Sequence, residues 1–345
     1  LLRLRLVQRE EVTERANPVR VLIGVDVGGT TTSGGLVTLD GEVLSVVQVP
    51  THREGPGTGV ETLLDVVGHL LAEARACGLA LDGLGVGIAG PVDVEKGMML
   101  ALPNLVAEFG NVPIGARLGA MAGVPVFVDN DVRALALAEW TFGLGRGASS
   151  LVVLAIGSGV GGGIVLDGRL VRGHHWHGGE IGHFPVKFDG PRCLCGGRGC
   201  LGAYLSGPQL AARARERVAG HRESALLALA GGDPARIKAA LVFQAAAAGD
   251  PVAAAIVEEA CEALGAGLGG IVNALHPEVI VVTGGVVASL LPLETDIRHH
   301  IARYALAPAL EETRIHFVHT DKRATVLGGA ALVLYELGHR ERLSA

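Results

Sequence analysis

The sequence is poor in aromatic residues, in cysteine and in long apolar runs. Aromatic residues make up 3% of the 345 residues and hydrophobic residues 49%, so we expect a globular core of mainly aliphatic side chains. No apolar run reaches the roughly 18 residues that a membrane-spanning helix needs, so we expect no membrane span. The 29 Lys and Arg residues are fewer than the 35 Asp and Glu residues, which gives a net charge of −6. This charge gives nucleic-acid binding no electrostatic support.

The first residues do not have the pattern of a targeting segment. The stretch LLRLRLVQRE alternates Leu with Arg and lacks the continuous apolar core of a signal peptide. We therefore expect residues 1–20 to form a short tail and the protein to be cytoplasmic. The length of the chain exceeds the ~250–300 residues at which a single core stops growing, which predicts two domains.

Two segments repeat the same order of features and predict a duplicated α/β fold. Residues 24–39 and 157–166 each place a glycine turn between two apolar strands. We expect one α/β lobe over residues 21–137, a second over 138–324 and a cleft between them. The closing helix, about 325–345, is expected to pack back on the first lobe.

Helices are predicted in two further places. Thr58 and Glu61 have the spacing of a capping box, before a helical pattern that stops at Gly78. The Ala-rich stretch 208–275 is helical by composition, with a loop near residues 231–234.

Three of the five cysteines lie in one glycine-rich stretch, CLCGGRGC, which a histidine in GGEIGH closely precedes. Zinc takes four Cys or His ligands in its structural sites, and this loop supplies a Cys3His set. A disulfide is the alternative, but it would leave one of the three thiols unpaired, and nothing else indicates an oxidising compartment. We predict a structural zinc loop over residues 183–200, with the ligands His183, Cys193, Cys195 and Cys200.

The other histidines and cysteines are weaker candidates for zinc. His174, His175 and His177 lie nearby, but four ligands already complete the tetrahedron. Cys77 and Cys261 fall in predicted helices and are expected to be buried apolar residues.

Three glycine turns have the character of loops that bind phosphate or a nucleoside. Glycine lets backbone N–H groups approach a ligand closely, and hydroxyl side chains add donors. Asp26, in the first turn, could hold Mg²⁺ through water. A plain β-hairpin is the alternative for this turn, and none of the three matches the Lys-bearing loop GxxxxGKS/T. The candidate residues are Asp26, Gly28, Gly29, Thr30, Thr31, Gly157, Ser158, Gly159, Gly284 and Gly285.

Asp129-Asn130-Asp131 follows the predicted strand VPVFV and opens a helix. A carboxylate at a helix N-terminus is commonly a cap, and this interpretation applies to Asp129. Asp131 would lie in the first turn, near the cleft. There a carboxylate can accept a proton from a substrate hydroxyl that attacks a phosphoryl group. Asn130 both donates and accepts, which suits a sugar hydroxyl, and Glu180 is another carboxylate beside the metal loop.

The order of these segments resembles the ROK family of repressors, open reading frames and sugar kinases, within the actin-like ATPase superfamily. The resemblance covers residues 21 to about 335. It implies two RNase H-like domains that bind ATP, with Mg²⁺, and a sugar in the cleft between them. The matching stretches are GVDVGGTTTSGGLV, GVGIAGPVD, LPNL, DNDVRALALAE, IGSGVGGGIVLDGRLVRG, GGEIGH, CLCGGRGC and VVTGGVV.

The resemblance also implies roles for individual residues. Asp131 becomes the base that deprotonates the acceptor hydroxyl, and the glycine turns become phosphate loops and a nucleoside contact. His183 would use one ring nitrogen for zinc and the other for a sugar hydroxyl. The implied sugar contacts are Asn104, Asn130, Glu180 and His183.

The function implied by the resemblance is ATP-dependent phosphorylation of a hexose, with glucose at its 6-hydroxyl as the leading substrate. Other hexoses and N-acetylhexosamines, such as N-acetylmannosamine and N-acetylglucosamine, stay open because Gly202 stands where the family commonly has a glutamate that touches the sugar. A sugar-responsive regulator or sensor is the alternative of another class, although the residues before Val21 are too few for a winged helix. A homodimer or homotetramer is implied, without nucleic-acid or membrane partners.

Overall fold

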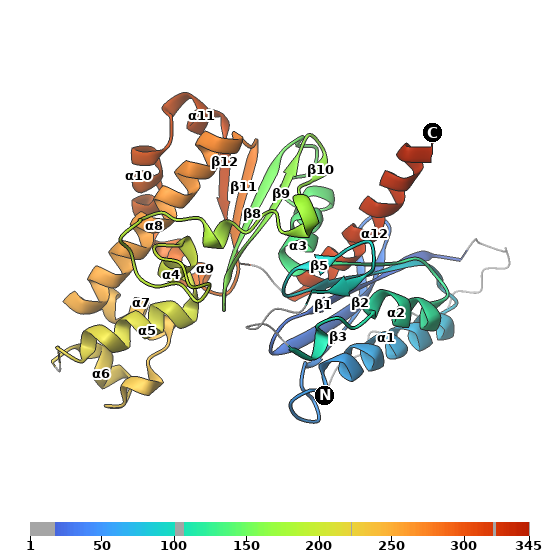
Figure 1. The fold of residues 1–345 in the computed structure, drawn as a ribbon, viewed down its shortest axis with the longest axis horizontal. Helices are drawn as coiled ribbons and strands as arrows, with labels where there is room; N and C mark the ends of the chain where they lie inside the picture. The colour runs from blue at the N-terminus through green and yellow to red at the C-terminus, as the bar shows by residue number, and fades with distance from the viewer. Residues whose placement is uncertain (1–17, 101–106, 222, 320–321, 345) are drawn as a thin grey trace, which may run out of the picture.

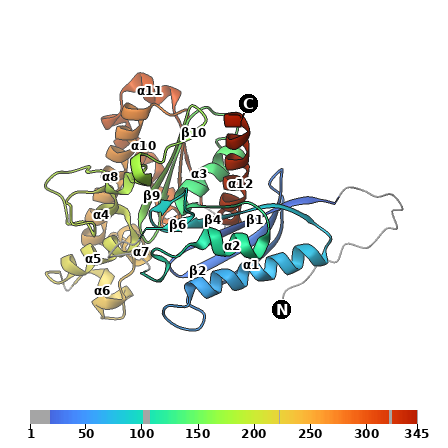
Figure 2. The same ribbon diagram turned by 45° about the vertical axis from the view of Figure 1, so that its right-hand side comes forward.

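The computed structural model describes residues 18–100, 107–221, 223–319 and 322–344. The predicted tail, up to residue 17, and the predicted sugar contact Asn104 lie outside the described residues. The strands form two five-stranded sheets and a two-stranded ribbon. Figures 1 and 2 show helices on the outer faces of the large sheets and further helices between them. The predicted α/β class is confirmed, since both sheets mix parallel and antiparallel strands.

The first sheet has five strands in the order β3-β2-β1-β4-β7. The three strands β1, β2 and β3 form antiparallel pairs, whereas β4 and β7 join in parallel with β1. The predicted glycine turn after Val27 connects β1 to β2. The strands are β1 (Arg20–Val27), β2 (Thr31–Thr38), β3 (Val43–Pro50), β4 (Ala80–Ile88) and β7 (Val126–Asn130).

The second sheet repeats this arrangement, in the order β10-β9-β8-β11-β12. Its strands β8, β9 and β10 form antiparallel pairs, and β11 and β12 join in parallel with β8. The repeated hairpins expected from the two glycine turns are therefore present. The strands are β8 (Leu151–Ile156), β9 (Val160–Leu166), β10 (Arg169–Leu170), β11 (Val279–Thr283) and β12 (Arg314–Phe317), and a separate ribbon pairs β5 (Val92–Asp93) with β6 (Met98–Met99).

Three buried apolar clusters hold these layers together. The first joins α1 (Gly59–Ala76) and α2 (Ile114–Ala122) to the first sheet. The second joins the second sheet to the helices on its outer face, among them α8 (Pro251–Leu275). The third lies between the sheets, with α3 (Asp131–Thr141) and α12 (Lys322–Ser344). The remaining helices are α4 (Leu201–Leu205), α5 (Gly207–Val218), α6 (Ala225–Leu229), α7 (Ala239–Ala247), α9 (Val287–Leu290), α10 (Glu294–Tyr304) and α11 (Ala307–Glu312).

Two glycines let the C-terminal helix α12 lie directly on the first sheet. A Cβ atom at Gly24 of β1 would lie 1.9 Å from the carbonyl oxygen of Val326. One at Gly85 of β4 would lie 2.0 Å from the carbonyl oxygen of Gly329. Neither distance leaves room for a side chain, so α12 contacts the backbone of these strands. Figure 1 shows the resulting position of α12 beside β1.

The predicted capping box is wrong. Thr58 does precede α1, but its hydroxyl makes no hydrogen bond to the helix and donates to the carbonyl oxygen of Gly55 at 2.8 Å. The first N–H group of the helix, at Gly59, instead donates to the carboxylate of Glu108 at 3.1 Å. A carboxylate from another segment thus accepts at the start of the helix, although from Gly59 and not from Thr58, whose N–H a capping box assigns to Glu61. The end of the helix before Gly78 is as predicted.

Two other predictions need correction. The Ala-rich stretch is divided into four α-helices, α5 to α8, although its loop at Gly231-Gly232 is present. Cys261 is buried as expected, whereas Cys77 is exposed because it follows the last residue of α1.

The longest apolar helices lie in this Ala-rich part. Within the described ranges no single helix has the length and hydropathy of a membrane span. The helices α7 and α8 reach the required length and hydropathy only as a pair, and the chain bends by 111° between them.

Candidate functional site

Strand register brings Asp26 and Asp129 to the same edge of the first sheet. Asp26 of β1 pairs with Gly87 of β4, and Gly87 pairs with Asp129 of β7. Because these three strands are parallel, the segments that follow them begin side by side. The turn after Asp26 and the start of α3, with Asp131, therefore lie at one edge.

Asn130, and not Asp129, caps α3. The Oδ1 atom of Asn130 accepts hydrogen bonds from two backbone N–H groups of the helix, at 3.0 and 3.1 Å. Its Nδ2 atom donates to the carbonyl oxygen of Gly90 at 3.2 Å and to Oδ1 of Asp131 at 2.9 Å. The predicted cap at Asp129 is wrong: this residue is fully buried, and its carboxylate accepts from the N–H of Asn130 and from two arginine side chains instead of from N–H groups of the helix. The amide of Asn130 is thus fully engaged, and it orients the carboxylate of Asp131.

Asp131 lies in the first turn of α3, where its carboxyl group has lost most of its hydration. Burial raises the pKa of this carboxyl group above the ordinary value of 3.8, and the charge of Glu180 raises it further. A hydrogen bond from the backbone N–H of Val132, at 2.9 Å, opposes this shift. A carboxylate with a raised pKa is a stronger base, which suits proton abstraction from a hydroxyl group.

The predicted phosphate loops leave open space above several of their glycines. Within the described residues, no atom lies within 4 Å of the position that a Cβ would take at Gly29, Gly157, Gly159 and Gly285. At Gly28 the only such contact is with a backbone oxygen, at 3.2 Å. This geometry fits a ligand that approaches the backbone. Thr30 and Ser158 are exposed in the same two turns, and Thr31 begins β2.

The second and third glycine turns come together because β8 and β11 are neighbouring parallel strands. The N–H of Val286 donates to the carbonyl oxygen of Ile156 at 3.1 Å. Gly284 has a φ of +106°, and a Cβ there would lie 2.5 Å from the same carbonyl oxygen. Only glycine fits this turn, which leaves Gly285 at the open surface beside Gly157.

The glycines of β9 are required by close packing. From the sequence alone they could not be distinguished from the glycines of the predicted phosphate loop. A Cβ at Gly161 would lie 2.6 Å from the side chain of Val132, and one at Gly163 would lie 2.5 Å from that of Ala136. A Cβ at Gly162 would lie 2.5 Å from the carbonyl oxygen of Gly179. These glycines therefore let α3 and the segment before Glu180 pack closely on the second sheet.

A buried ion network beside Asp131 was not predicted. Arg133 is 1% exposed, and its Nη1 donates to Oδ1 of Asp129 at 3.2 Å. The Nε of Arg172 donates to the other oxygen of Asp129 at 2.7 Å, and Arg172 also pairs with Glu336 of α12. The available signal was a single arginine on the apolar helix pattern VRALALAE. A buried arginine of this kind needs a carboxylate partner, which here comes from the preceding strand.

Glu180 and His183 lie at the two ends of η3, a short 3-10 helix (Ile181–His183), and both are exposed. The charge of Glu180 raises the pKa of Asp131, so the two carboxyl groups lie within electrostatic range although they come from segments far apart in the chain.

The four predicted zinc ligands are also close together. All four donor atoms lie within 4.8 Å of one another. The Sγ atoms of Cys195 and Cys200 are 3.8 Å apart, and Sγ of Cys193 is 3.6 Å from Nδ1 of His183. With zinc–sulfur bonds of ~2.3 Å, tetrahedral donors lie about 3.7 Å apart, so these four donors fit a zinc ion. None of the three other histidines considered above belongs to the cluster in the described part of the chain.

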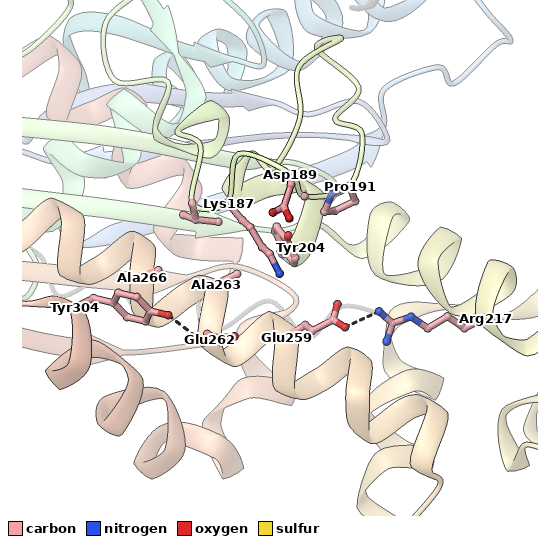
Figure 3. A pocket seen from close by; sticks show the side chains of 12 residues that line it. Lys187, Asp189, Pro191, Tyr204, Arg217, Glu259, Glu262, Ala263, Ala266 and Tyr304 are labelled. Atoms are coloured by element: carbon pink, nitrogen blue, oxygen red, sulfur yellow. Dashed lines mark hydrogen bonds and ion pairs between the residues drawn. The ribbon is translucent and has the colours of Figure 1, made fainter.

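A cavity of 510 Å³ lies between the segment 186–191 of the cysteine loop and the helices α4, α5, α8 and α10. Figure 3 shows Lys187 extending over it, Arg217 paired with Glu259 and the hydroxyl of Tyr304 bonded to Glu262. None of the residues predicted to bind ATP or sugar lines this cavity. It is therefore separate from the site around Asp131.

The motifs and the geometry can be compared with known proteins. A glucokinase from Thermotoga maritima is 33% identical over 321 residues, which cover 93% of this chain and 99% of the relative. The crystal structure of a ROK family glucokinase from Streptomyces griseus, in complex with glucose and AMPPNP, is 31% identical and has a TM-score of 0.73. The match covers 92% of this chain and 100% of the Streptomyces griseus chain.

A regulator is similar as well. The crystal structure of a ROK family transcriptional regulator, a homologue of the E. coli MLC protein, is 28% identical and has a TM-score of 0.78. The match covers 92% of this chain and 79% of the regulator. The family model described as "ROK family" matches residues 22–336, nearly the whole chain. The family predicted from the motifs is confirmed: this chain belongs to the ROK family.

Proposed function

We propose that this protein transfers the γ-phosphoryl group of ATP to a hexose, and that its preferred acceptor is the 6-hydroxyl of glucose. The observation that carries the proposal is Asp131, a shielded carboxylate with a raised pKa beside Glu180. Open glycine turns lie on both sheets, at Gly29 and at Gly157. The similarity to the two glucokinases described above supports glucose as the acceptor.

In the proposed reaction Asp131 accepts the proton of the acceptor hydroxyl as the oxygen attacks the γ-phosphorus. The bond from phosphorus to the bridging oxygen breaks, and ADP leaves with its electron pair. Asn130 holds the carboxylate of Asp131 through its Nδ2 atom. Mg²⁺ bound with ATP would neutralise phosphate charge, and Asp26 is the residue proposed to hold it, through water.

The acceptor would be held by Glu180 and by His183. The carboxylate of Glu180 can accept hydrogen bonds from sugar hydroxyls. Nδ1 of His183 faces Cys193, which leaves Nε2 to donate to the sugar when zinc is bound. We propose zinc as a structural cross-link held by His183 and the three cysteines. Asn130 would contact the sugar only by exchanging one of its present hydrogen bonds.

We also propose that each sheet, with its helices, forms one lobe, with boundaries near residues 21–137 and 138–324 and with α12 on the first lobe. Closure of the lobes would exclude water and favour transfer to the sugar over hydrolysis. A homodimer or homotetramer and a cytoplasmic location complete the proposal.

Two other functions have support. The similarity to the transcriptional regulator favours a sugar-responsive protein without turnover. Gly202 keeps an N-acetylhexosamine open as the acceptor, because it provides no carboxylate next to η3.

A coupled ADP-release assay over a panel of sugars separates these functions. Glucose should give the highest kcat/KM, and nuclear magnetic resonance of the product should show phosphate on the 6-oxygen. Turnover that is faster with N-acetylmannosamine or N-acetylglucosamine would favour the second acceptor class. A protein that binds glucose but releases no ADP with any hexose would contradict the kinase and favour the regulator.

A further inference from the structure

The loop of residues 173–179, between β10 and η3, has a strained backbone. His175 and Trp176 have φ values of +50° and +66°, in the left-handed region that bulky side chains rarely adopt. Such residues persist only where the surrounding structure holds them in place. The glycines at the two ends of the loop, Gly173 and Gly179, also have positive φ, but without strain.

Arg133 is the side chain that holds this loop. Its Nη2 donates to the carbonyl oxygens of Trp176, at 2.6 Å, and of Gly178, at 2.8 Å. Its Nη1 donates to Asp129, which supplies the balancing charge. Because the guanidinium is buried and planar, its donors have fixed directions, and the two carbonyl groups are held at a fixed position relative to α3.

The contact between Arg133 and the 173–179 loop joins two segments that each carry residues of the proposed site. Arg133 is in the first turn of α3, two residues after Asp131. The loop continues through Gly179 directly into Glu180 and η3, and the N–H of Ile181 donates to the carbonyl oxygen of Gly179 at 2.7 Å. A displacement of the loop would therefore displace Glu180 relative to Asp131.

Within the described ranges, no other side chain donates a hydrogen bond to the carbonyl groups of this loop. The N–H of Gly178 donates to the carbonyl oxygen of Arg172 at 2.7 Å, which closes the loop on itself. Its 3-10 turn (His174–Trp176) contacts the β5 strand. Neither contact ties the loop to α3. The end of the loop at Gly179 also packs on Gly162 of β9, and Arg133 adds the direct side-chain link between the loop and α3.

We propose that Arg133 is a positioning residue, which sets the distance from Asp131 to the sugar contacts Glu180 and His183 by holding the 173–179 loop against α3. The proposal rests on the hexose kinase function proposed above. It assigns to this buried arginine a role in acceptor binding and alignment rather than in the chemical step itself.

The kinetic test compares Arg133→Lys with Arg213→Lys. Lysine keeps the charge but cannot donate to two carbonyl groups and a carboxylate in the same plane. Arg213 is a matched control, because it is a buried arginine (7% exposed) paired with Glu259 on the outer face of the second sheet. We expect kcat/KM for glucose to fall roughly 10- to 100-fold in Arg133→Lys, with the KM for ATP unchanged, and no such change in Arg213→Lys.

A second measurement does not depend on turnover. The sequence has two tryptophans, so Trp140→Phe leaves Trp176 as the only fluorophore of this type. In that background Arg133→Lys should shift the emission of Trp176 and increase its quenching by acrylamide, whereas Arg213→Lys should leave both unchanged. If the wild type phosphorylates no hexose, the proposed function fails, while the fluorescence still decides whether Arg133 holds the loop.

His175→Gly provides the test of mechanism, because glycine removes the strain at φ +50°. The loss caused by Arg133→Lys should be smaller in the His175→Gly background, and this double variant also serves if Arg133→Lys alone does not fold. An equal loss in both backgrounds would overturn the proposal. The proposal would also be overturned if Arg133→Lys left the kinetic constants within about twofold of wild type and the Trp176 emission unchanged. Identical effects of Arg213→Lys would overturn it as well.

Discussion

Glu180 lies within electrostatic range of Asp131, and its negative charge adds to the effect of burial in raising the pKa of the Asp131 carboxyl group. The first residue follows the loop that leaves β10, and the second begins α3 directly after β7. Two carboxylates at such a position make one of them a stronger base, while the other remains available to accept hydrogen bonds from a hydroxylated ligand.

Asp131→Asn should abolish phosphoryl transfer without abolishing acceptor binding. Asparagine keeps the shape of the side chain but cannot take up the hydroxyl proton, so kcat should fall roughly 10²- to 10⁴-fold. Coupled ADP release measures turnover, and calorimetry with glucose measures binding. Asp167→Asn, in the exposed turn after β9, is the control and should keep wild-type kcat. A variant at Asp131 with more than half of the wild-type turnover would exclude this residue as the base.

The acidic limb of the pH profile should respond to Glu180. Because burial and the charge of Glu180 both raise the pKa of Asp131, activity should be lost on acidification at a pH above the ordinary 3.8 of an aspartate. Glu180→Gln removes one of these causes, so the acidic limb of kcat at saturating glucose should move to lower pH. A limb that stays in place, or moves to higher pH, would show that Asp131 is not the group that titrates.

Asp131 should also destabilise the fold at neutral pH. Its pKa is higher in the folded state than in the unfolded chain, so folding takes up a proton between these two pKa values. The contribution of Asp131 to stability is thus fully present below 3.8 and is lost as the pH rises through the folded pKa. Asp131→Asn should raise the unfolding temperature at pH 7 and change it less at pH 4. An equal gain at both values would point to a cause other than ionisation.

The purified protein should contain one zinc ion per chain. Cys195→Ser removes one donor of the cluster at His183, so elemental analysis should show loss of zinc and the KM for glucose should rise. Cys77→Ser, at an exposed cysteine outside the cluster, is the matched control and should keep both at the wild-type level. Stoichiometric zinc in Cys195→Ser would rule out the predicted ligand set.

Much of this fold could be predicted because its signals are local. The turns after Val27 and Ile156 are marked by glycine between apolar runs, and both form hairpins of the expected kind. The zinc ligands lie within one short stretch of chain, so their chemistry and spacing alone were enough to bring them together as candidates.

The predictions that failed depend on partners distant in sequence. At the start of α1, the N–H of Gly59 donates to Glu108, a residue 49 positions away in sequence. Asp129 and Asn130 are adjacent residues with similar capping propensity, but Asn130 caps α3 whereas the carboxylate of Asp129 pairs with the buried Arg133. The contact of Arg133 with the backbone at Trp176 could not be predicted from the sequence. Every residue has a backbone carbonyl group, so the acceptor leaves no mark in the residue types.

Gly202 is the last position with a consequence for the substrate. It is in α4, and a Cβ there would lie 3.1 Å from the carbonyl oxygen of Gly182, next to His183. A glutamate at this position, as the family commonly has, would bring a carboxylate to the proposed sugar site. We expect Gly202→Glu to lower the KM for glucose, by up to about tenfold if one charged hydrogen bond is gained.

Gly202→Ala is the matched control for this prediction. It adds the same Cβ atom, which displaces the carbonyl of Gly182 slightly, but it adds no carboxylate. If both variants raise the KM for glucose equally, steric displacement dominates and the site cannot accept a glutamate. If only Gly202→Glu lowers it, and does so for glucose more than for N-acetylglucosamine, then a carboxylate at this position favours glucose over the N-acetylhexosamine.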